Sequence, residues 1–162
     1  MKTPGFVIGY ALLFASCAAY ADKLQLPADA PPAFQAECAS CHLAFPAQLM
    51  AADDWRRVMA TLDKHYGDNA SSLDEKTRRS LEDFLVRNAG KPSKVGAGGT
   101  AELPRLTASP WFKRKHHEVR KTDWAHAKVK APANCAACHT KAAAGSYRER
   151  EIVMPDGRKW ED

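Results

Sequence analysis

The stretch Cys38-Ala39-Ser40-Cys41-His42 decides how this chain is built, and the same pattern returns as Cys135-Ala136-Ala137-Cys138-His139. The pattern C-x-x-C-H is typical of the attachment site of a c-type haem. Two thiols three positions apart lie along one edge of a helical turn, so both can form thioethers with the vinyl groups of one porphyrin. The histidine that follows then supplies the proximal ligand of the iron. Each of these two pentads is therefore predicted to bind one covalent haem c. The cysteines would be Cys38, Cys41, Cys135 and Cys138, and the proximal ligands His42 and His139.

Other uses of a C-x-x-C pair need a context that this sequence does not provide. A structural zinc site needs four ligands from knuckles that lie close in space, whereas these two pairs are far apart in the sequence. A thioredoxin-like redox dithiol needs a βαβ pattern, which is absent here. The haem interpretation is therefore favoured, and zinc is its main alternative.

Residues 1–21 are predicted to be a signal peptide. Lys2 gives a positively charged start, residues 6–14 form an apolar stretch too short to span a bilayer, and Ala19-Tyr20-Ala21 is an A-x-A cleavage site. Because c-type haem is attached on the far side of the membrane in bacteria, the mature protein is expected in the periplasm. Cys17 leaves lipid anchoring as the weaker alternative, since a lipoprotein box would prefer Leu where Phe14 stands.

Charge is distributed unevenly along the chain. Residues 22–90 hold 8 Lys/Arg and 11 Asp/Glu, a net charge of −3, and residues 91–130 hold 10 and 3, a net charge of +7. The residues near 113–121 could therefore form a docking surface for an acidic protein partner. The equally weighted alternative is that this charge balances haem propionates and covers a solvated face. No nucleic-acid partner is expected, and the oligomeric state stays open.

The first half, residues 22–90, is predicted to be one small helical haem domain. Pro32 suits the first turn of a short helix that reaches the haem cysteines. Asp53 or Asp54 is expected to cap the next helix, whose apolar stripe is Trp55, Val58, Met59 and Leu62. His65 continues this stripe and is predicted to be the distal ligand of the first haem, and Gly67 ends the helix.

A further helix is predicted after the capping box from Ser72 to Glu75. Its buried side would hold Leu73, Thr77, Leu81, Phe84 and Leu85. Gly90 and Pro92 then end it, and we expect this helix to pack over the edge of the first haem.

Residues 91–104 are predicted to be a linker, because they are rich in glycine, proline and small residues without periodicity.

In the second haem domain, residues 105–162, a helix is expected from Ser109-Pro110 to about Val119. On this helix His116 shares a face with Phe112, whereas His117 falls among basic residues. His116 is the first candidate for the second distal ligand, followed by His117 and then His126. The tail from Tyr147 is a candidate cover for a haem edge.

The residues resemble a known family. The relevant stretches are ECASCHLAFP, DDWRRVMATLDKHYGDNASSLD, DFLVRNAG, SPWFKRKHHEV and NCAACHTKAAAGSYRE, which cover nearly all of residues 34–153. They are similar to the bacterial di-haem cytochrome c family typified by the partner of the sphaeroides haem protein. The resemblance implies two helical domains, each with a covalent haem and two histidine ligands. It places His42 and His65 at one iron and His139 and His116 at the other. It also implies electron transfer with an oxygen-binding single-haem cytochrome c or a membrane b-type cytochrome.

The expected fold is all-α, with two small helical c-type cytochrome domains and much irregular structure around the haems. The expected function is transfer of single electrons in the periplasm, with no catalytic residue. Six histidines are present and four would saturate both irons, which disfavours an open iron. The alternatives are a haem peroxidase and a gas-binding or sensor protein in which one distal histidine is displaced.

Overall fold

The computed structural model describes residues 24, 26–70 and 72–161. The predicted signal peptide, its cleavage site after Ala21 and Cys17 lie outside the described residues. Within that described part, the chain forms α-helices and short 3₁₀ turns, with three isolated β-bridges and no strand. The predicted all-α fold with much irregular structure is confirmed. Among these same residues no helix has the length and apolar character needed to cross a bilayer.

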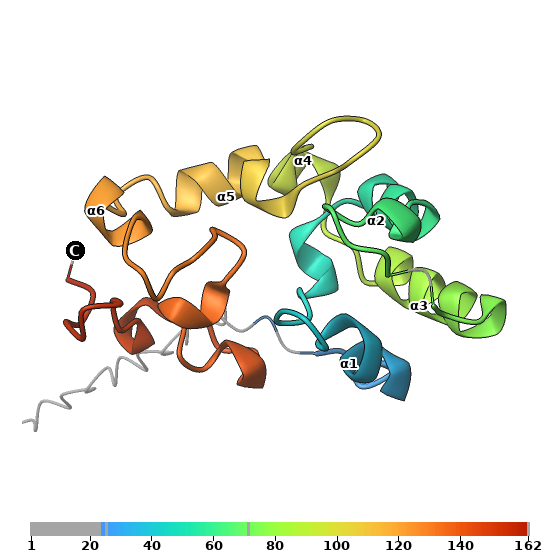
Figure 1. Ribbon diagram of the computed structural model, residues 1–162, viewed down its shortest axis with the longest axis horizontal. Coiled ribbons are helices and arrows are strands. Elements are labelled where there is room, and N and C mark those ends of the chain that lie inside the picture. The colour runs from blue at the N-terminus through green and yellow to red at the C-terminus, as the bar shows by residue number, and fades with distance from the viewer. Residues whose placement is uncertain (1–23, 25, 71, 162) are drawn as a thin grey trace, which may run out of the picture.

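The first half is built on the helices α1 (Pro32–Cys38), α2 (Ala52–Ala60) and α3 (Glu75–Arg87). They lie together on the right of Figure 1, where α2 and α3 pack against each other. Leu81, Phe84 and Leu85 are spaced so that they share one face of α3, and all three are buried. With them the core contains Phe34, Leu49, Trp55, Val58 and Met59. The predicted apolar faces of these helices are confirmed, as is Pro32 in the first turn of α1.

The predicted starts of α2 and α3 are wrong in detail. α2 begins after Ala51, without a side-chain cap, and Asp53 and Asp54 lie inside its first turn, where their charge favours the helix dipole. α3 is capped by Asp74, whose carboxylate accepts a hydrogen bond from the Thr77 N–H at 3.0 Å, and the Ser72 capping box is not used.

α2 also ends earlier than predicted, at Ala60 instead of near Gly67. The Thr61 hydroxyl donates to the Arg57 carbonyl, a contact that competes with helix continuation. The chain then tightens into the 3₁₀ turn η2 (Leu62–Lys64), which delivers His65 at its end.

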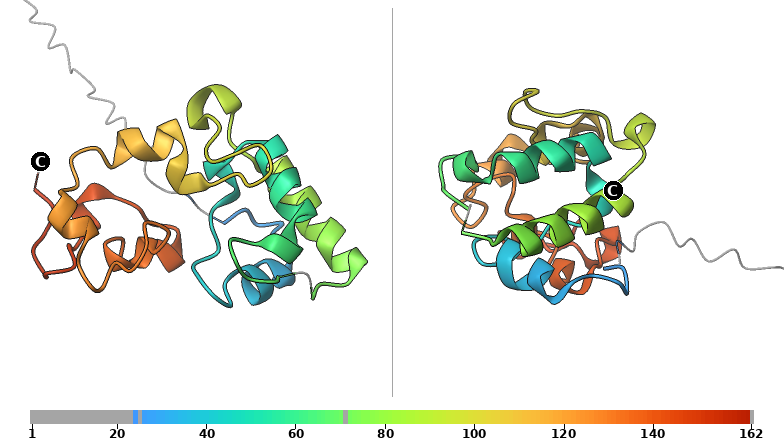
Figure 2. Two further views of the ribbon diagram at one scale, coloured as in Figure 1. Left: turned by 45° about the horizontal axis from the view of Figure 1, so that its top comes forward. Right: turned by 90° about the vertical axis from the view of Figure 1, so that its right-hand side faces the viewer.

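The second half contains shorter elements. They are η3 (Leu106–Ala108), α5 (Pro110–Lys115), α6 (Lys121–Trp124), η4 (Cys135–Ala137), η5 (Ala142–Ala144) and η6 (Glu149–Glu151). Figure 2 shows that they form a second lobe beside the first. The predicted Ser109 cap of α5 is confirmed, since its hydroxyl accepts from the Phe112 N–H at 3.1 Å. The predicted end near Val119 is wrong. α5 stops at Lys115. Nδ1 of the His116 ring lies 2.8 Å from the Phe112 carbonyl oxygen, at hydrogen-bond distance.

Residues 91–104, predicted as a linker, are folded against their neighbours. They include α4 (Pro92–Val95), which lies beside α5 in Figure 1. A side-chain carbon added at Gly98 would lie only 2.4 Å from the Arg105 carbonyl oxygen and 2.4 Å from the Ser109 nitrogen, so only glycine fits there. A loop then closes through the Gly99–Pro104 bridge. The division of the chain into two domains at this segment stays a prediction.

Candidate haem sites

A cavity of about 470 Å³, called the second cavity because the second pentad lines it, lies mainly in the second half of the chain, and its size is suited to a cofactor. Its lining includes the second-pentad residues Cys135, Cys138 and His139, together with His116. Apolar residues of the second half form most of the remaining wall, among them Leu106, Phe112, Val129, Ile152, Met154 and Trp160. Gln48, Leu49 and Gly90 reach the same cavity from the first half. The site for the second haem is therefore built by both halves of the chain.

Two pairs of histidines face each other. The ring centres of His42 and His65 are 6.2 Å apart, with an angle of 20° between the ring planes. Those of His116 and His139 are 6.1 Å apart, with an angle of 83°. Because metal–imidazole bonds are about 2 Å long and a ring centre lies about 1 Å behind its nitrogen, two rings that share one metal ion have centres about 6 Å apart. Both pairs have the separation that a haem iron between them requires.

Hydrogen bonds orient two of these rings. Nδ1 of His42 lies 2.8 Å from the Leu43 carbonyl oxygen, and Nδ1 of His116 lies 2.8 Å from that of Phe112. A carbonyl oxygen can only accept, so both Nδ1 atoms carry the proton and both Nε2 atoms are free to bind a metal. His42 also stacks on Phe45, and His116 on Phe112, at centre distances of 4.7 and 4.0 Å. These contacts hold the rings in the ligating tautomer and orientation.

Burial favours the neutral form of three of the paired imidazoles, those of His65, His116 and His139. It lowers the pKa of His139 to about 4, with a smaller contribution from the charge of His116. Burial likewise lowers the pKa of His65, aided by the charge of His42, and that of His116. Neutral imidazole is the form that ligates iron, so the pockets favour the required protonation state near neutral pH.

The cysteines lie in environments that suit thioether formation. Burial raises the pKa of Cys38 and of Cys135 to about 11, so it favours the uncharged form of both sulfurs. Among the described residues, no three His, Cys, Asp or Glu side chains gather into a site for a metal ion. A thioether carries no charge, and it can occupy these apolar positions without a desolvation cost.

The structure distinguishes among the three candidates for the second distal ligand. His116 faces His139, whereas the side chain of His117 is 69% exposed and its Nδ1 lies 3.0 Å from the Arg114 carbonyl oxygen. His126 contacts the backbone of Lys128 and does not line the cavity. The geometry therefore supports the first-ranked candidate, His116.

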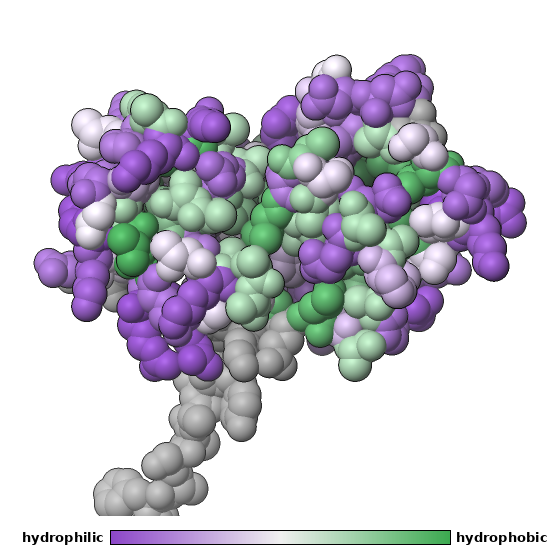
Figure 3. Space-filling model, turned by 60° about the horizontal axis from the view of Figure 1, so that its bottom comes forward, coloured by the Kyte–Doolittle hydropathy of each residue, from purple (hydrophilic) through white to green (hydrophobic). Residues whose placement is uncertain are grey.

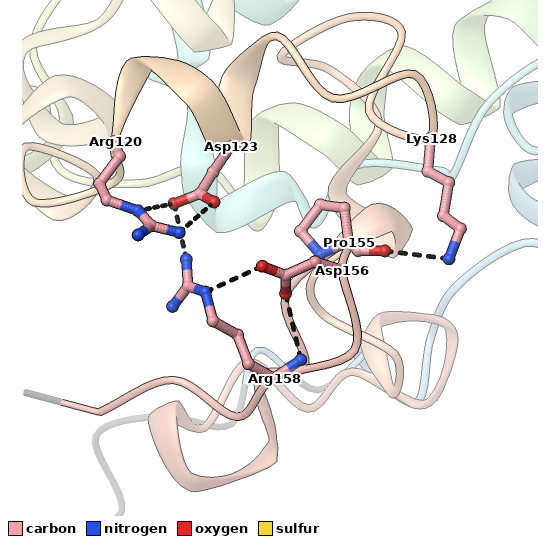
Figure 4. Close-up of polar contacts among 6 residues, drawn as sticks. All are labelled: Arg120, Asp123, Lys128, Pro155, Asp156 and Arg158. Carbon is pink, nitrogen blue, oxygen red and sulfur yellow. Dashed lines mark hydrogen bonds and ion pairs between the residues drawn. The ribbon is translucent and has the colours of Figure 1, made fainter.

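The C-terminal tail covers the second cavity, which sequence reasoning raised only as a possibility. Tyr147, Ile152, Met154 and Trp160 line the wall. Figure 4 shows how the tail is held: the Asp123 carboxylate accepts hydrogen bonds from Arg120 at 2.9 Å and from Arg158 at 2.7 Å. Arg158 in turn pairs with Asp156 at 3.1 Å. Sequence reasoning missed this cluster. The i,i+3 spacing of Arg120 and Asp123 was a readable signal, but Arg158 lies too far along the chain to be paired by pattern.

Comparisons with known proteins agree with these sites. A family model described as dihaem cytochrome c matches residues 34–147. Among solved structures, the chain is similar to a diheme cytochrome type c from Shewanella baltica OS155, with 34% identity and a TM-score of 0.69, covering 80% of this chain and 97% of that one. It is also similar to a diheme cytochrome c from Rhodobacter sphaeroides, with 39% identity and a TM-score of 0.63, covering 74% and 98%. A comparison with curated proteins gives no match.

The family match confirms the predicted resemblance and the two predicted haem c groups, for which all four cysteines are present. It spans both pentads and all four histidines of the facing pairs. This chain therefore belongs to the family of dihaem cytochromes c.

Proposed function

We propose that this protein carries single electrons between redox proteins through two haems, each ligated by two histidines. The observation that carries the proposal is the facing of two histidine pairs at 6.2 and 6.1 Å, His42 with His65 and His139 with His116. With an imidazole on each side, neither iron has a position for a substrate. Electron transfer needs no such position, whereas peroxidase chemistry and gas binding do.

The chain's own residues favour electron transfer in three ways. The cysteines of the pentads hold the haems covalently, so the cofactors are retained in every redox state. The carbonyl contacts of His42 and His116 fix the ligand tautomer and raise ligand basicity. The apolar walls around the second site limit the access of water. A haem supplies an iron that changes between ferrous and ferric with few rearrangements around it.

The proposal includes location and partners. The signal-peptide pattern of residues 1–21 and the haem attachment sites together support export to the periplasm. Partners of the kind implied by the resemblance are an oxygen-binding single-haem cytochrome c or a membrane b-type cytochrome. The basic residues near 113–121 support a partner with an acidic surface: Lys113, Arg114, Lys115, Arg120 and Lys121 are exposed.

Carbon monoxide binding to the reduced protein tests the ligation. The unaltered protein should not bind it, because both irons are closed. His65→Ala should open only the first haem and His116→Ala only the second, each seen as a Soret shift of one haem. His117→Ala is the matched control and should leave both haems closed, because its side chain is exposed.

Other outcomes would select the alternatives. Carbon monoxide binding by the unaltered protein would show that a distal histidine is displaced, as a gas-binding protein or a peroxidase requires. Opening of the second haem by His117→Ala instead of His116→Ala would move the ligand to the neighbouring residue.

A further inference from the structure

The turn that follows His65 has an unusual backbone. The Asp68 N–H donates to the His65 carbonyl at 3.0 Å, and both residues between them have positive φ, 52° at Tyr66 and 108° at Gly67. Two positive φ values are the pattern of a type I′ turn, whose central positions favour Asn, Asp and Gly. Gly67 fits this preference, but Tyr66 is a bulky residue in a conformation that such residues rarely adopt. A strained residue persists only where its surroundings hold it.

The Tyr66 side chain is held from the other end of the 91–104 segment. Its hydroxyl donates a hydrogen bond to the Pro104 carbonyl. The Arg105 guanidinium lies over its ring, with the central carbon 4.4 Å from the ring centre, a cation–π contact. The same ring packs against the imidazole of His65 in a T-shaped contact, with centres 4.9 Å apart and planes at 72°. Tyr66 thus lies between the distal histidine of the first haem and the start of the second half.

The anchor for Tyr66 is itself well fixed. The Arg105 N–H donates to the Gly98 carbonyl at 2.8 Å, and the Thr100 N–H donates to that of Leu103 at 3.2 Å. Gly98 also packs directly against the backbone of Ser109, as the lack of room for a side chain there shows. The loop of residues 98–109 is therefore held by its own backbone contacts where it meets Tyr66.

We propose that Tyr66 is a positioning residue that holds His65 against the first haem through Pro104 and Arg105. This inference rests on the proposed ligation by His65. The contacts to Pro104 and Arg105 restrain the ring of Tyr66, the ring restrains the imidazole beside it, and the strained turn is kept in the shape that presents His65. The first haem's distal ligand is thereby tied to a segment 38 residues further along the chain.

Four substitutions separate the elements of this arrangement. Tyr66→Phe keeps the ring and removes the hydrogen bond to Pro104. Tyr66→Asn suits the turn better than tyrosine does, yet removes both anchoring contacts. Each should turn the first haem of the reduced protein from closed to measurably open to carbon monoxide, and Tyr66→Asn should have the larger effect, about tenfold tighter binding than Tyr66→Phe. Arg105→Leu should act in the same direction, and Arg105→Lys, which keeps a cation over the ring, should restore the original behaviour.

The second haem serves as the internal control for folding, because its spectrum and its resistance to carbon monoxide should not change. Arg79→Leu is the matched control for Arg105→Leu, since it removes an exposed arginine whose ion-pair partner is Glu75 of the same helix, and it should leave the first haem closed. If His65→Ala opens the first haem and Tyr66→Asn does not, the positioning role is wrong and the proposed function stands. If His65→Ala itself leaves the first haem closed, the proposed ligation is wrong and this inference falls with it.

Discussion

Asp123 lies in the wall of the second cavity and is buried, with only 6% of the residue exposed to solvent. The two hydrogen bonds from Arg120, and then the one from Arg158, hold the pKa of this carboxyl well below its usual range. A depressed folded-state pKa stabilises the fold at every pH above the unfolded pKa of about 3.9, and this contribution is lost as the pH falls through the folded value. The cluster therefore contributes fully at neutral pH and weakens only in strong acid.

Asp123→Asn should lower the free energy of unfolding by about 1–2 kcal/mol, because two partly exposed guanidinium groups lose their buried charged partner. Denaturant unfolding at pH 7 measures this loss. The loss should shrink at a pH well below 3.9, where the unfolded-state carboxyl is protonated and the unaltered protein begins to lose the same contribution.

Asp53→Asn is the control for Asp123→Asn. It removes one partner of the ion pair between Asp53 and Arg56, whose side chains are 77% and 51% exposed. Exposed pairs of this kind contribute about 0–1 kcal/mol. Equal losses from the two substitutions would show that the Asp123 cluster is an ordinary surface contact and does not hold the tail.

The sequence alone brings forward the proposed ligands as candidates, while it does not reveal the residues that support them. Cys38, Cys41 and His42 are set by spacing alone, because the chemistry of haem attachment requires these residue types in this order. His65 is predicted from its place on an apolar helical stripe, but α2 ends at Ala60 and the turn η2 presents His65 instead. Tyr66 and Arg158 depend on contacts with residues far along the chain, and a periodic pattern carries no information on such contacts.

α5 links a buried helix cap to a proposed iron ligand. Ser109 is 2% exposed and caps the helix at Phe112, and the helix has only six residues before His116 ends it. Because a helix this short has few hydrogen bonds of its own, the cap is a large part of what fixes its direction. A substitution at Ser109 should therefore change the position of the His116 ring.

Ser109→Ala should lower the free energy of unfolding by about 1 kcal/mol and should also alter the spectrum of the second haem. Asp74→Ala is the matched control, since it removes the cap of α3 and should cost about the same stability. α3 carries none of the four histidines, so Asp74→Ala should leave both haem spectra unchanged. Similar spectral changes in the two variants would mean that the Ser109 cap has no particular influence on His116.

Helix existence and helix limits differ in how well the sequence predicts them. The apolar stripes of α2 and α3 and the Ser-Pro start of α5 identify these helices correctly. Their ends depend on side chains that compete for backbone carbonyl groups of the last turn. The Thr61 hydroxyl donates to the Arg57 carbonyl, and the His116 ring contacts the Phe112 carbonyl. The folded state of residues 91–104 depends on close backbone contacts at Gly98, which composition alone does not reveal.

The molecule carries unlike charges on its two halves. Figure 3 shows one face, on which hydrophobic residues gather between hydrophilic residues at the two ends. The first half is acidic and the segment from 91 to 130 has a net charge of +7. Part of this positive charge lies at the second cavity, where Lys91, Lys94 and Lys115 line the wall. Lys113 and Lys121 are exposed and do not line the cavity.

We therefore expect Lys113 and Lys121 to steer an acidic redox partner toward the second haem, while the acidic first half faces a different partner. Electron transfer favours brief and frequent encounters, so docking should depend on charge more than on a large buried area. Changing both lysines to Glu should slow the bimolecular transfer rate about tenfold at low salt, without shifting either haem spectrum. Salt should also slow electron transfer by the unaltered protein, because exposed charges are screened beyond about 8 Å at physiological ionic strength.

Lys76→Glu reverses a charge on the exposed face of α3. It is the control for the lysine reversals and should have little effect on the transfer rate. Stopped-flow measurement over a salt series tests this expectation. If the transfer rate changes neither with salt nor with the double charge reversal, the basic residues do not steer a partner and serve only to balance the haem propionates.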